Sequence, residues 1–185
     1  MTTVCFDGKK LVSDSQATVG DNFIVSLVTK KIHTPEEGEY WDYNGRRILA
    51  FGFAGNAAAI DYVKAELNKG LTHCTEMTSS SYLEFDALMV MEDGTTMIFS
   101  GNVERGNQCY HSFAAEVPVC IGAGTPFALA VMESHKSNQA EKGIKAAIKF
   151  CAYTGGDLQI WEMPPIPEVR SVRPVVEAPT EDKKE

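Results

Sequence analysis

The chain has 185 residues, of which 44% are hydrophobic and 23% charged, as expected for a globular domain with one sizeable core. With 17 Lys and Arg against 25 Asp and Glu, its net charge of −8 argues against nucleic acid and anionic membranes as partners. It contains no apolar run of roughly 20 residues and no signal-peptide pattern. The five cysteines lack C-x-x-C spacing, so we expect reduced thiols in a cytoplasmic protein, with neither a disulfide framework nor a zinc site.

The first part of the chain shows hairpin, strand and helix patterns in succession. Asp7 and Gly8 lie between two short apolar runs, and an Asp-Gly pair in that setting is a strong hairpin signal. The apolar run 48–54 is typical of a buried strand, and Asn56 is a suitable cap for a following helix. The elements expected are the hairpin with its return strand at 11–13, a β-rich stretch at 22–32, a turn at Asn44-Gly45, the strand at 48–54, and a helix from Asn56 to Leu67 that stops at Gly70.

The second part of the chain predicts another hairpin, two helices and a closing strand. The pair Asp93-Gly94 separates two β-rich runs, and Pro126 suits the first turn of a helix capped by Thr125. Residues 72–81 are polar and without periodicity, which predicts a loop. The remaining elements expected are strands at 87–91, 95–100 and 117–121, helices at 125–136 and 139–154, and a strand at 158–163.

The order of these elements indicates the fold class. Strands, one helix, further strands, two helices and a last strand predict an α+β fold with two antiparallel sheets stacked between helices. We expect one domain over residues 1–163. Residues 164–185 contain five of the eight prolines and charges of both signs, so we predict a disordered tail. This tail is either a plain linker or a docking peptide for a partner.

Thr2 is the first candidate for a catalytic residue. We expect an aminopeptidase to remove Met1, because threonine is small, and to leave Thr2 with a free amino group. Its hydroxyl is a nucleophile, and its own amine, with a pKa of about 7.7–8.0, can accept the hydroxyl proton at neutral pH. Many proteins begin Met-Thr without such a role, so the surrounding pattern has to distinguish the two interpretations.

Several separated motifs supply that pattern. They are TTV at 2–4, LVSDSQATVG at 11–20, KKI at 30–32, FAG at 53–55, IGAG at 121–124 and CAYTGG at 151–156. In this order they resemble the proteasome β-subunit family of N-terminal nucleophile hydrolases, and within that family the bacterial HslV-type peptidases most closely. The resemblance covers about residues 2–163 and leaves the predicted tail outside.

The resemblance implies a fold and a set of catalytic residues. The fold is a four-layer αββα sandwich. Thr2 is the implied nucleophile, and Lys31 is implied to lie beside its hydroxyl, where a positive charge favours the neutral amine and the forming alkoxide. Asp14 is implied to hold Lys31 as an ion-pair partner, and the amide of Gly55 to donate to the oxyanion. Apart from the resemblance, Lys31 could be a solvated lysine, Asp14 a turn residue and Gly55 a helix start.

Four further residues match positions that line the specificity pocket in the family. They are mostly apolar, so the resemblance implies an uncharged or aromatic substrate side chain in that pocket. Core packing would explain the same residues equally well. The four residues are Ala17, Thr29, Phe53 and Ala57.

The sequence departs from the family pattern at two places. Family members usually carry Ser where this chain has Ala123, which removes a hydroxyl from the surroundings of the nucleophile and predicts weakened activity. Between Gly70 and Ala87 the family places a second long helix, whereas residues 71–86 are too few and too polar to form it. The stacking of two rings is therefore in question.

The sequence predicts a threonine endopeptidase that cleaves unfolded polypeptide inside a homo-oligomeric ring. The resemblance implies a AAA+ unfoldase as partner, and no motif implies a cofactor or a metal. Two other functions stay open. Ala123 and the missing helix favour a structural or regulatory subunit with weak or no catalysis. The third hypothesis is a small-amide hydrolase that acts without a chamber.

Overall fold

The computed structural model describes residues 2–20, 23–72, 83–104, 107–137 and 139–166. Within them the chain forms helices and antiparallel sheets, which confirms the α+β class. The helices are α1 (Ala59–Lys69), α2 (Thr125–Ser134) and α3 (Gln139–Phe150). The strands are β1 (Thr3–Phe6), β2 (Lys10–Ser13), β3 (Ala17–Val19), β4 (Phe23–Ser26), β5 (Ile32–His33), β6 (Asp42–Tyr43), β7 (Arg46–Gly55), β8 (Phe85–Met91), β9 (Thr96–Glu104), β10 (Asn107–Ala115), β11 (Val119–Gly122) and β12 (Gln159–Glu162).

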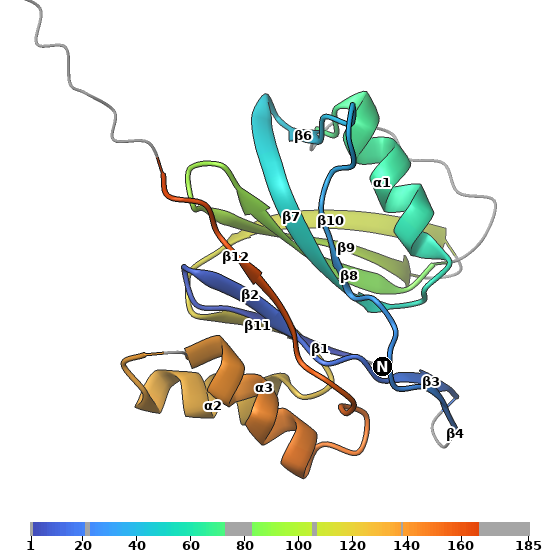
Figure 1. Cartoon of the computed structure of the whole chain (residues 1–185). Helices are drawn as coiled ribbons and strands as arrows, with labels where there is room; N and C mark the ends of the chain where they lie inside the picture. The colour runs from blue at the N-terminus through green and yellow to red at the C-terminus, as the bar shows by residue number, and fades with distance from the viewer. Residues whose placement is uncertain (1, 21–22, 73–82, 105–106, 138, 167–185) are drawn as a thin grey trace, which may run out of the picture.

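Two sheets form the body of the molecule. One has four strands in the order β11-β1-β2-β12, and the other has six, in the order β10-β9-β8-β7-β5 with β6 paired to β7. Their facing sides enclose an apolar cluster that includes Phe6, Leu11 and Val90. Figure 1 shows α1 on the outer face of the six-stranded sheet, and α2 and α3 on the outer face of the four-stranded sheet. A further apolar cluster fills each of these two outer interfaces.

The first hairpin follows directly from its turn residues. The Asp7 carboxylate accepts hydrogen bonds from the N–H groups of Lys9 (3.0 Å) and Lys10 (2.9 Å). Gly8 has a φ of +89°, a backbone conformation that glycine adopts without strain. The predicted pairing of β1 with β2 is therefore confirmed, and Thr2 lies immediately before β1.

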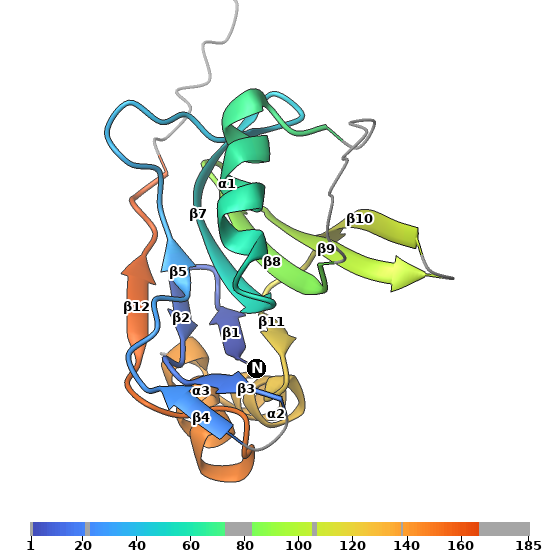
Figure 2. The same cartoon turned by 90° about the vertical axis from the view of Figure 1, so that its right-hand side faces the viewer.

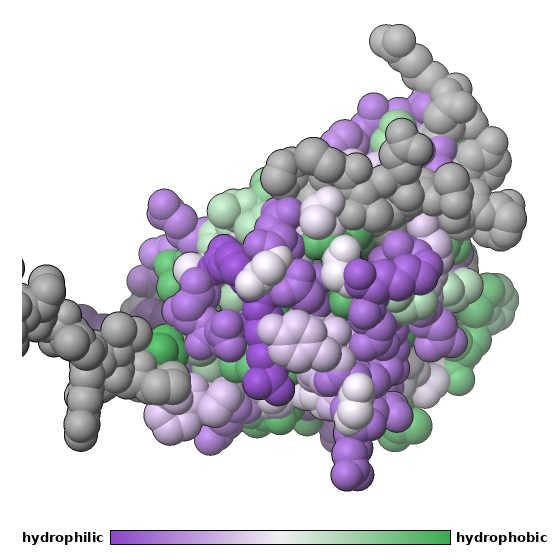
Figure 3. Space-filling view, turned by 90° about the horizontal axis from the view of Figure 1, so that it is seen from above, coloured by the Kyte–Doolittle hydropathy of each residue, from purple (hydrophilic) through white to green (hydrophobic). Residues whose placement is uncertain are grey.

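Helix α1 is confirmed, but it begins later than predicted. The side-chain oxygen of Asn56 accepts the N–H of Ala58 (3.0 Å) in the turn before the helix, and Ala58 occupies the N-cap position. The helix buries Ala59, Val63 and Leu67, which are spaced four residues apart, against the six-stranded sheet. The face of the molecule seen from the α1 end is predominantly hydrophilic (Figure 3), as expected for the solvent side of an amphipathic helix.

Some elements differ from the sequence prediction. The nine-residue strand β10 was not predicted, because it is a partly exposed edge strand whose residues show no clear alternation of apolar and polar side chains. Thr125 is the first residue of α2, and Gly124 occupies the N-cap position, so Thr125 is not the predicted cap. The hairpin of β8 and β9 and the closing strand β12 are confirmed.

Two predicted regions lie largely outside the described residues. Residues 73–82 include most of the predicted loop and of the segment judged too short for a second long helix. Residues 167–185 make up most of the predicted tail. In the part of the chain that the structure describes, no helix is long and apolar enough to cross a bilayer.

His33 gives the stability of the fold a specific dependence on pH. This residue of β5 is 5% exposed and stacks on Phe51, with ring centroids 5.1 Å apart. Neither ring nitrogen has a hydrogen-bond partner among the described residues. Burial, with a further contribution from the charges of Lys64 and Lys30, lowers the pKa of His33 from 6.5 to about 4.

We therefore expect acid to destabilise the protein through His33. Below pH 6.5 the unfolded chain binds a proton at His33, whereas the folded chain does so only below about pH 4. The free energy of unfolding should consequently fall by about 2 kcal/mol between about pH 7 and pH 5 through this residue. The variant His33→Phe keeps the stacking and removes the titration, so its loss over this range should be smaller by that amount. Urea unfolding of both proteins at several pH values measures the difference, and parallel pH curves would contradict it.

Candidate active site

The backbone of Thr2 is held by contacts from both neighbours of β1. Its carbonyl oxygen accepts a hydrogen bond from the N–H of Ala123 (2.9 Å), just beyond β11. Gly122 has a φ of +91°, and a Cβ added there would lie 2.0 Å from that same oxygen, so only glycine fits. On the other side, the N–H of Asp14 donates to the carbonyl oxygen of Thr3 (3.3 Å). Thr2 is only 2% exposed, and these contacts hold the backbone of Thr2 and Thr3 at the start of β1.

The ammonium group of Lys31 lies against the Thr2 hydroxyl. Lys31 Nζ donates a hydrogen bond to Thr2 Oγ1, and the lysine is 7% exposed. Its carbonyl oxygen accepts the N–H of Phe53 (3.0 Å), which ties the residue to β7. Burial lowers the pKa of Lys31, whereas the charge of Asp14 raises it. A buried cation in this position can stabilise negative charge that develops on the hydroxyl oxygen.

Asp14 binds the backbone around Thr2 and does not contact Lys31 directly. Its fully buried carboxylate accepts hydrogen bonds from the N–H groups of Thr3 (2.9 Å), Gln16 (3.2 Å) and Gly155 (3.1 Å). Burial raises the pKa of Asp14, whereas these hydrogen bonds and the charge of Lys31 lower it. The ion pairs between described residues do not include Asp14 with Lys31. The expected direct ion pair is therefore corrected to a charge interaction over a longer distance, because backbone N–H groups occupy the carboxylate.

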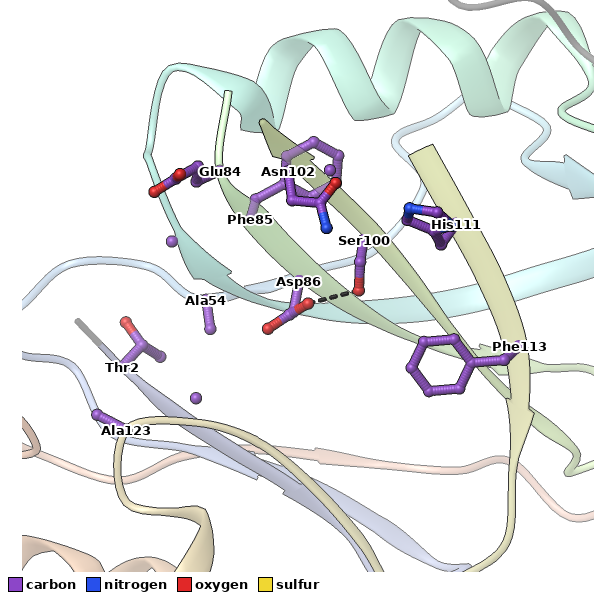
Figure 4. A pocket seen from close by; sticks show the side chains of 13 residues that line it. Thr2, Ala54, Glu84, Phe85, Asp86, Ser100, Asn102, His111, Phe113 and Ala123 are labelled. Carbon is purple, nitrogen blue, oxygen red and sulfur yellow. Dashed lines mark hydrogen bonds between the residues drawn. The ribbon is translucent and has the colours of Figure 1, made fainter. Parts of the chain in front are cut away.

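A cavity of about 560 Å³ opens beside Thr2. Figure 4 shows Thr2 and Ala123 at one end and Phe113 at the other, with Asp86 between them. The Asp86 carboxylate accepts a hydrogen bond from the Ser100 hydroxyl (2.5 Å), which fixes its orientation. Among the described residues, no group of three or more His, Cys, Asp or Glu side chains is arranged to hold a metal ion.

Gly55 lies in the wall of this cavity, at the end of β7. Its φ is +124°, and an added Cβ would lie 2.5 Å from the carbonyl oxygen of Glu84. The close approach of the chain before β8 therefore requires glycine at this position. Gly55 and Thr2 thus line one cavity, and Lys31 contacts Thr2 without lining the cavity itself.

The four residues expected in the specificity pocket do not line this cavity. Phe53 is 2% exposed and belongs to the apolar cluster under α1, where its ring stacks on Phe85 with centroids 5.5 Å apart. Side chains alternate along β7, so Phe53 faces the helix while Ala54 faces the cavity, and a role of Phe53 in binding substrate stays a prediction. For Ala17, Thr29 and Ala57, a role in binding substrate stays a prediction.

The sequence did not identify the polar residues on the far wall of the cavity. Glu84, Asp86, Ser100 and His111 lie on or next to β8, β9 and β10, far from Thr2 in the sequence. They reach the cavity only because the two sheets pack face to face, which no local pattern reveals. The side chain of Gln159, which binds the backbone at Lys31, was missed for the same reason.

The fold and the site together define an α+β protein in which a threonine at the start of one sheet meets a lysine from the other. The chain is similar in structure to BPH from Thiobacillus denitrificans. The complex of BPH with epoxomicin matches with a TM-score of 0.52 at 16% identity, over 89% of this chain and 100% of that chain. A second BPH structure matches with a TM-score of 0.51 at 16% identity, over 89% and 98% of the two chains. No protein-family model and no curated protein matches the sequence. This likeness concerns the fold.

Replacement of Asp14 tests how far the site depends on this carboxylate. Asp14→Ala leaves three buried N–H groups without an acceptor, so the free energy of unfolding should fall by about 3 kcal/mol or more. Asp14→Asn keeps one side-chain oxygen and should lose less. The exposed Asp157→Ala is the matched control and should change stability little. Urea unfolding measures all three, and equal losses for Asp14→Ala and Asp157→Ala would contradict the expectation.

Proposed function

We propose that this chain is a threonine-type peptidase with the N-terminal nucleophile hydrolase fold of proteasome β subunits. The observation that carries the proposal is the hydrogen bond from Lys31 Nζ to Thr2 Oγ1 beside a cavity of about 560 Å³. The packing of α1, two sheets, and α2 with α3 supports the four-layer αββα sandwich. The fold likeness to BPH, which was solved with the proteasome inhibitor epoxomicin, supports the same class of enzyme.

The proposed reaction begins once Met1 has been removed and Thr2 has a free amine. This amine, with an ordinary pKa of about 7.7–8.0, accepts the hydroxyl proton while Oγ1 attacks the carbonyl carbon of the substrate. The tetrahedral intermediate collapses when the peptide nitrogen takes that proton and leaves, which forms an ester on Thr2. Water, deprotonated by the same amine, then hydrolyses the ester, releases the acid product and restores the hydroxyl.

Neighbouring groups support these steps in the proposed mechanism. The charge of Lys31 beside Oγ1 stabilises the attacking oxygen and favours the neutral amine. Asp14 fixes the backbone of Thr3 and favours the charged form of Lys31. The N–H of Gly55 is the proposed donor to the oxyanion, and a donor of this kind contributes about 2.7–4 kcal/mol in other enzymes.

We propose unfolded polypeptide as the substrate and a homo-oligomeric ring as the assembly. The β3–β4 hairpin supports self-association, because Phe23 (72% exposed), Val25 (60%) and Val28 (81%) place apolar side chains on its surface and on the chain that follows. Figure 1 shows this hairpin at the right-hand edge of the molecule, and Figure 2 shows it on the side that faces the viewer. An HslV-type specificity, a AAA+ unfoldase and a cytoplasmic location are carried over from the sequence resemblance as parts of the proposal.

A structural or regulatory subunit is the second candidate, and Ala123 favours it. Ala123 binds the Thr2 carbonyl oxygen through its backbone, but its side chain is a methyl group without a hydroxyl. One lost hydrogen bond of this kind is worth about 0.5–1.5 kcal/mol, which weakens catalysis without abolishing it. The peptidase is therefore the first proposal.

Reaction with epoxomicin tests the nucleophile. We expect one covalent adduct on Thr2 in the protein processed at Met1, and none in Thr2→Ala.

The neighbouring lysines provide a matched pair, because Lys31 contacts the Thr2 hydroxyl while Lys30 is exposed. Lys31→Met should lower kcat for a fluorogenic peptide by about 100-fold or more, and Lys30→Met should leave it nearly unchanged.

Intact-mass and peptide mass spectrometry, together with peptide hydrolysis assays, measure these outcomes. The absence of both the adduct and peptide turnover would reject the peptidase and favour the structural subunit. Retention of Met1 would also favour the structural subunit, since the amine of Thr2 would then be blocked. Peptide turnover by a monomer in native mass spectrometry would instead favour a hydrolase that acts without a chamber.

The carboxylates in the cavity predict a substrate preference that differs from the uncharged or aromatic one inferred from the sequence. Glu84 and Asp86 line the cavity beside Thr2, and among the described residues no Lys or Arg lines it. Peptides with Lys or Arg next to the cleaved bond should therefore be preferred about fivefold over peptides with Glu. The double variant Glu84→Gln, Asp86→Asn should lose this preference, while the exposed Glu92→Gln should keep it. Values of kcat/KM for internally quenched peptides measure this preference in each protein. An unchanged preference in the double variant would contradict the expectation.

A further inference from the structure

The side chain of Gln159 binds the chain segment that presents Lys31. Gln159 is the first residue of β12 and lies on the same face of this strand as Trp161, which packs between the two sheets. Its Oε1 accepts the N–H groups of Lys31 (2.8 Å) and Ile32 (3.4 Å). Its Nε2 donates to the carbonyl oxygen of Thr29 (2.6 Å). One partly buried side chain thus binds the backbone on both sides of residue 30.

These hydrogen bonds connect the two sheets close to the proposed active site. Thr2 leads into β1 and Gln159 begins β12, so both belong to the four-stranded sheet. Lys31 leads into β5, at the edge of the six-stranded sheet. The contact between Lys31 Nζ and Thr2 Oγ1 therefore depends on how the two sheets are placed relative to each other. Through its hydrogen bonds, Gln159 connects the four-stranded sheet directly to the backbone of Lys31.

The other backbone contacts of this segment do not replace that connection. The Lys31 carbonyl oxygen accepts the N–H of Phe53 (3.0 Å), which lies in the same six-stranded sheet. The N–H of Thr29 donates to the carbonyl oxygen of Ser15 (2.9 Å), two residues before Lys31. Without Gln159, the N–H of Lys31 would lose its acceptor and the segment would have to move to reach water.

We propose that Gln159 is a positioning residue that places the Lys31 ammonium group against the Thr2 hydroxyl by binding the backbone of residues 29–32. Its expected effect on turnover rests on the proposed peptidase function. Its effect on the location and reactivity of Lys31 does not depend on that function. The inference about Gln159 and the peptidase proposal can therefore fail separately.

Kinetics of three variants test the effect on turnover. Gln159→Leu is similar in size and makes none of the three hydrogen bonds, so kcat should fall about 10- to 100-fold with little change in KM. Gln159→Glu keeps an acceptor for Lys31 and should recover part of kcat. Its negative charge should also move the alkaline limb of the pH–rate profile, where Lys31 loses its proton, to higher pH. Ile160→Ala is the control, since this exposed neighbour points to the other face of β12.

The reactivity of Lys31 gives a measurement that requires no catalysis. Competitive acetylation with acetic anhydride at several pH values, followed by peptide mass spectrometry, reports the exposure and pKa of each lysine amine. Lys31 should react slowly in the wild-type protein and severalfold faster in Gln159→Leu, with the exposed Lys30 as internal reference. Ile160→Ala should match the wild type.

The outcomes separate the inference from the proposed function. If the wild-type protein hydrolyses no peptide, the peptidase proposal fails, and acetylation alone decides the role of Gln159. Unchanged Lys31 reactivity in a folded Gln159→Leu overturns the inference, whether or not kcat falls. Thermal melting establishes that the variant is folded. If it is not, the same comparison of Lys31 reactivity is made with Gln159→Asn, whose shorter side chain does not span the distance.

Discussion

The contact between a lysine ammonium group and a threonine hydroxyl depends on two sheets that are held face to face. Thr2 enters the four-stranded sheet, and Lys31 enters the six-stranded sheet. Phe6, Leu11 and Val90 belong to the apolar cluster that fills the space between these sheets. The hydrophobic packing that stabilises the fold therefore also sets the distance between the two groups on which the proposed chemistry depends.

Burial of Lys31 beside Thr2 is tolerated because its surroundings compensate the charge. Removal of an ammonium group from water is unfavourable, and this is why the pKa of Lys31 is lowered. Asp14 offsets part of that cost through its negative charge, while backbone N–H groups hold its own carboxylate in place. The site is thus a network in which backbone, carboxylate and ammonium group each restrain the next. A change at one member alters the ionisation of the others.

The sequence predicted those parts of the structure that leave a local pattern. Asp7 and Gly8 predict the first hairpin, and the spacing of Val63 and Leu67 predicts α1. Strand β10 leaves no such pattern, because an edge strand with partly exposed faces imposes no strict alternation. Thr2 became a candidate from its position after Met1, but its role and that of Lys31 could be proposed only through the order of separated motifs. Gln159 could not be proposed as a positioning residue from the sequence, since the packing of the sheets determines its hydrogen-bond partners.

The burial of Thr2 sets an order of events during biosynthesis of the proposed enzyme. The proposed amine of Thr2 becomes free only when the leading residue is removed, and Thr2 is only 2% exposed in the folded chain. The strand that closes over one side of β1 is β11, which pairs Gly122 with Thr3. More than a hundred residues therefore have to leave the ribosome before this side can close. In the proposed enzyme, that interval would let an aminopeptidase remove Met1 from the nascent chain before β11 pairs with β1.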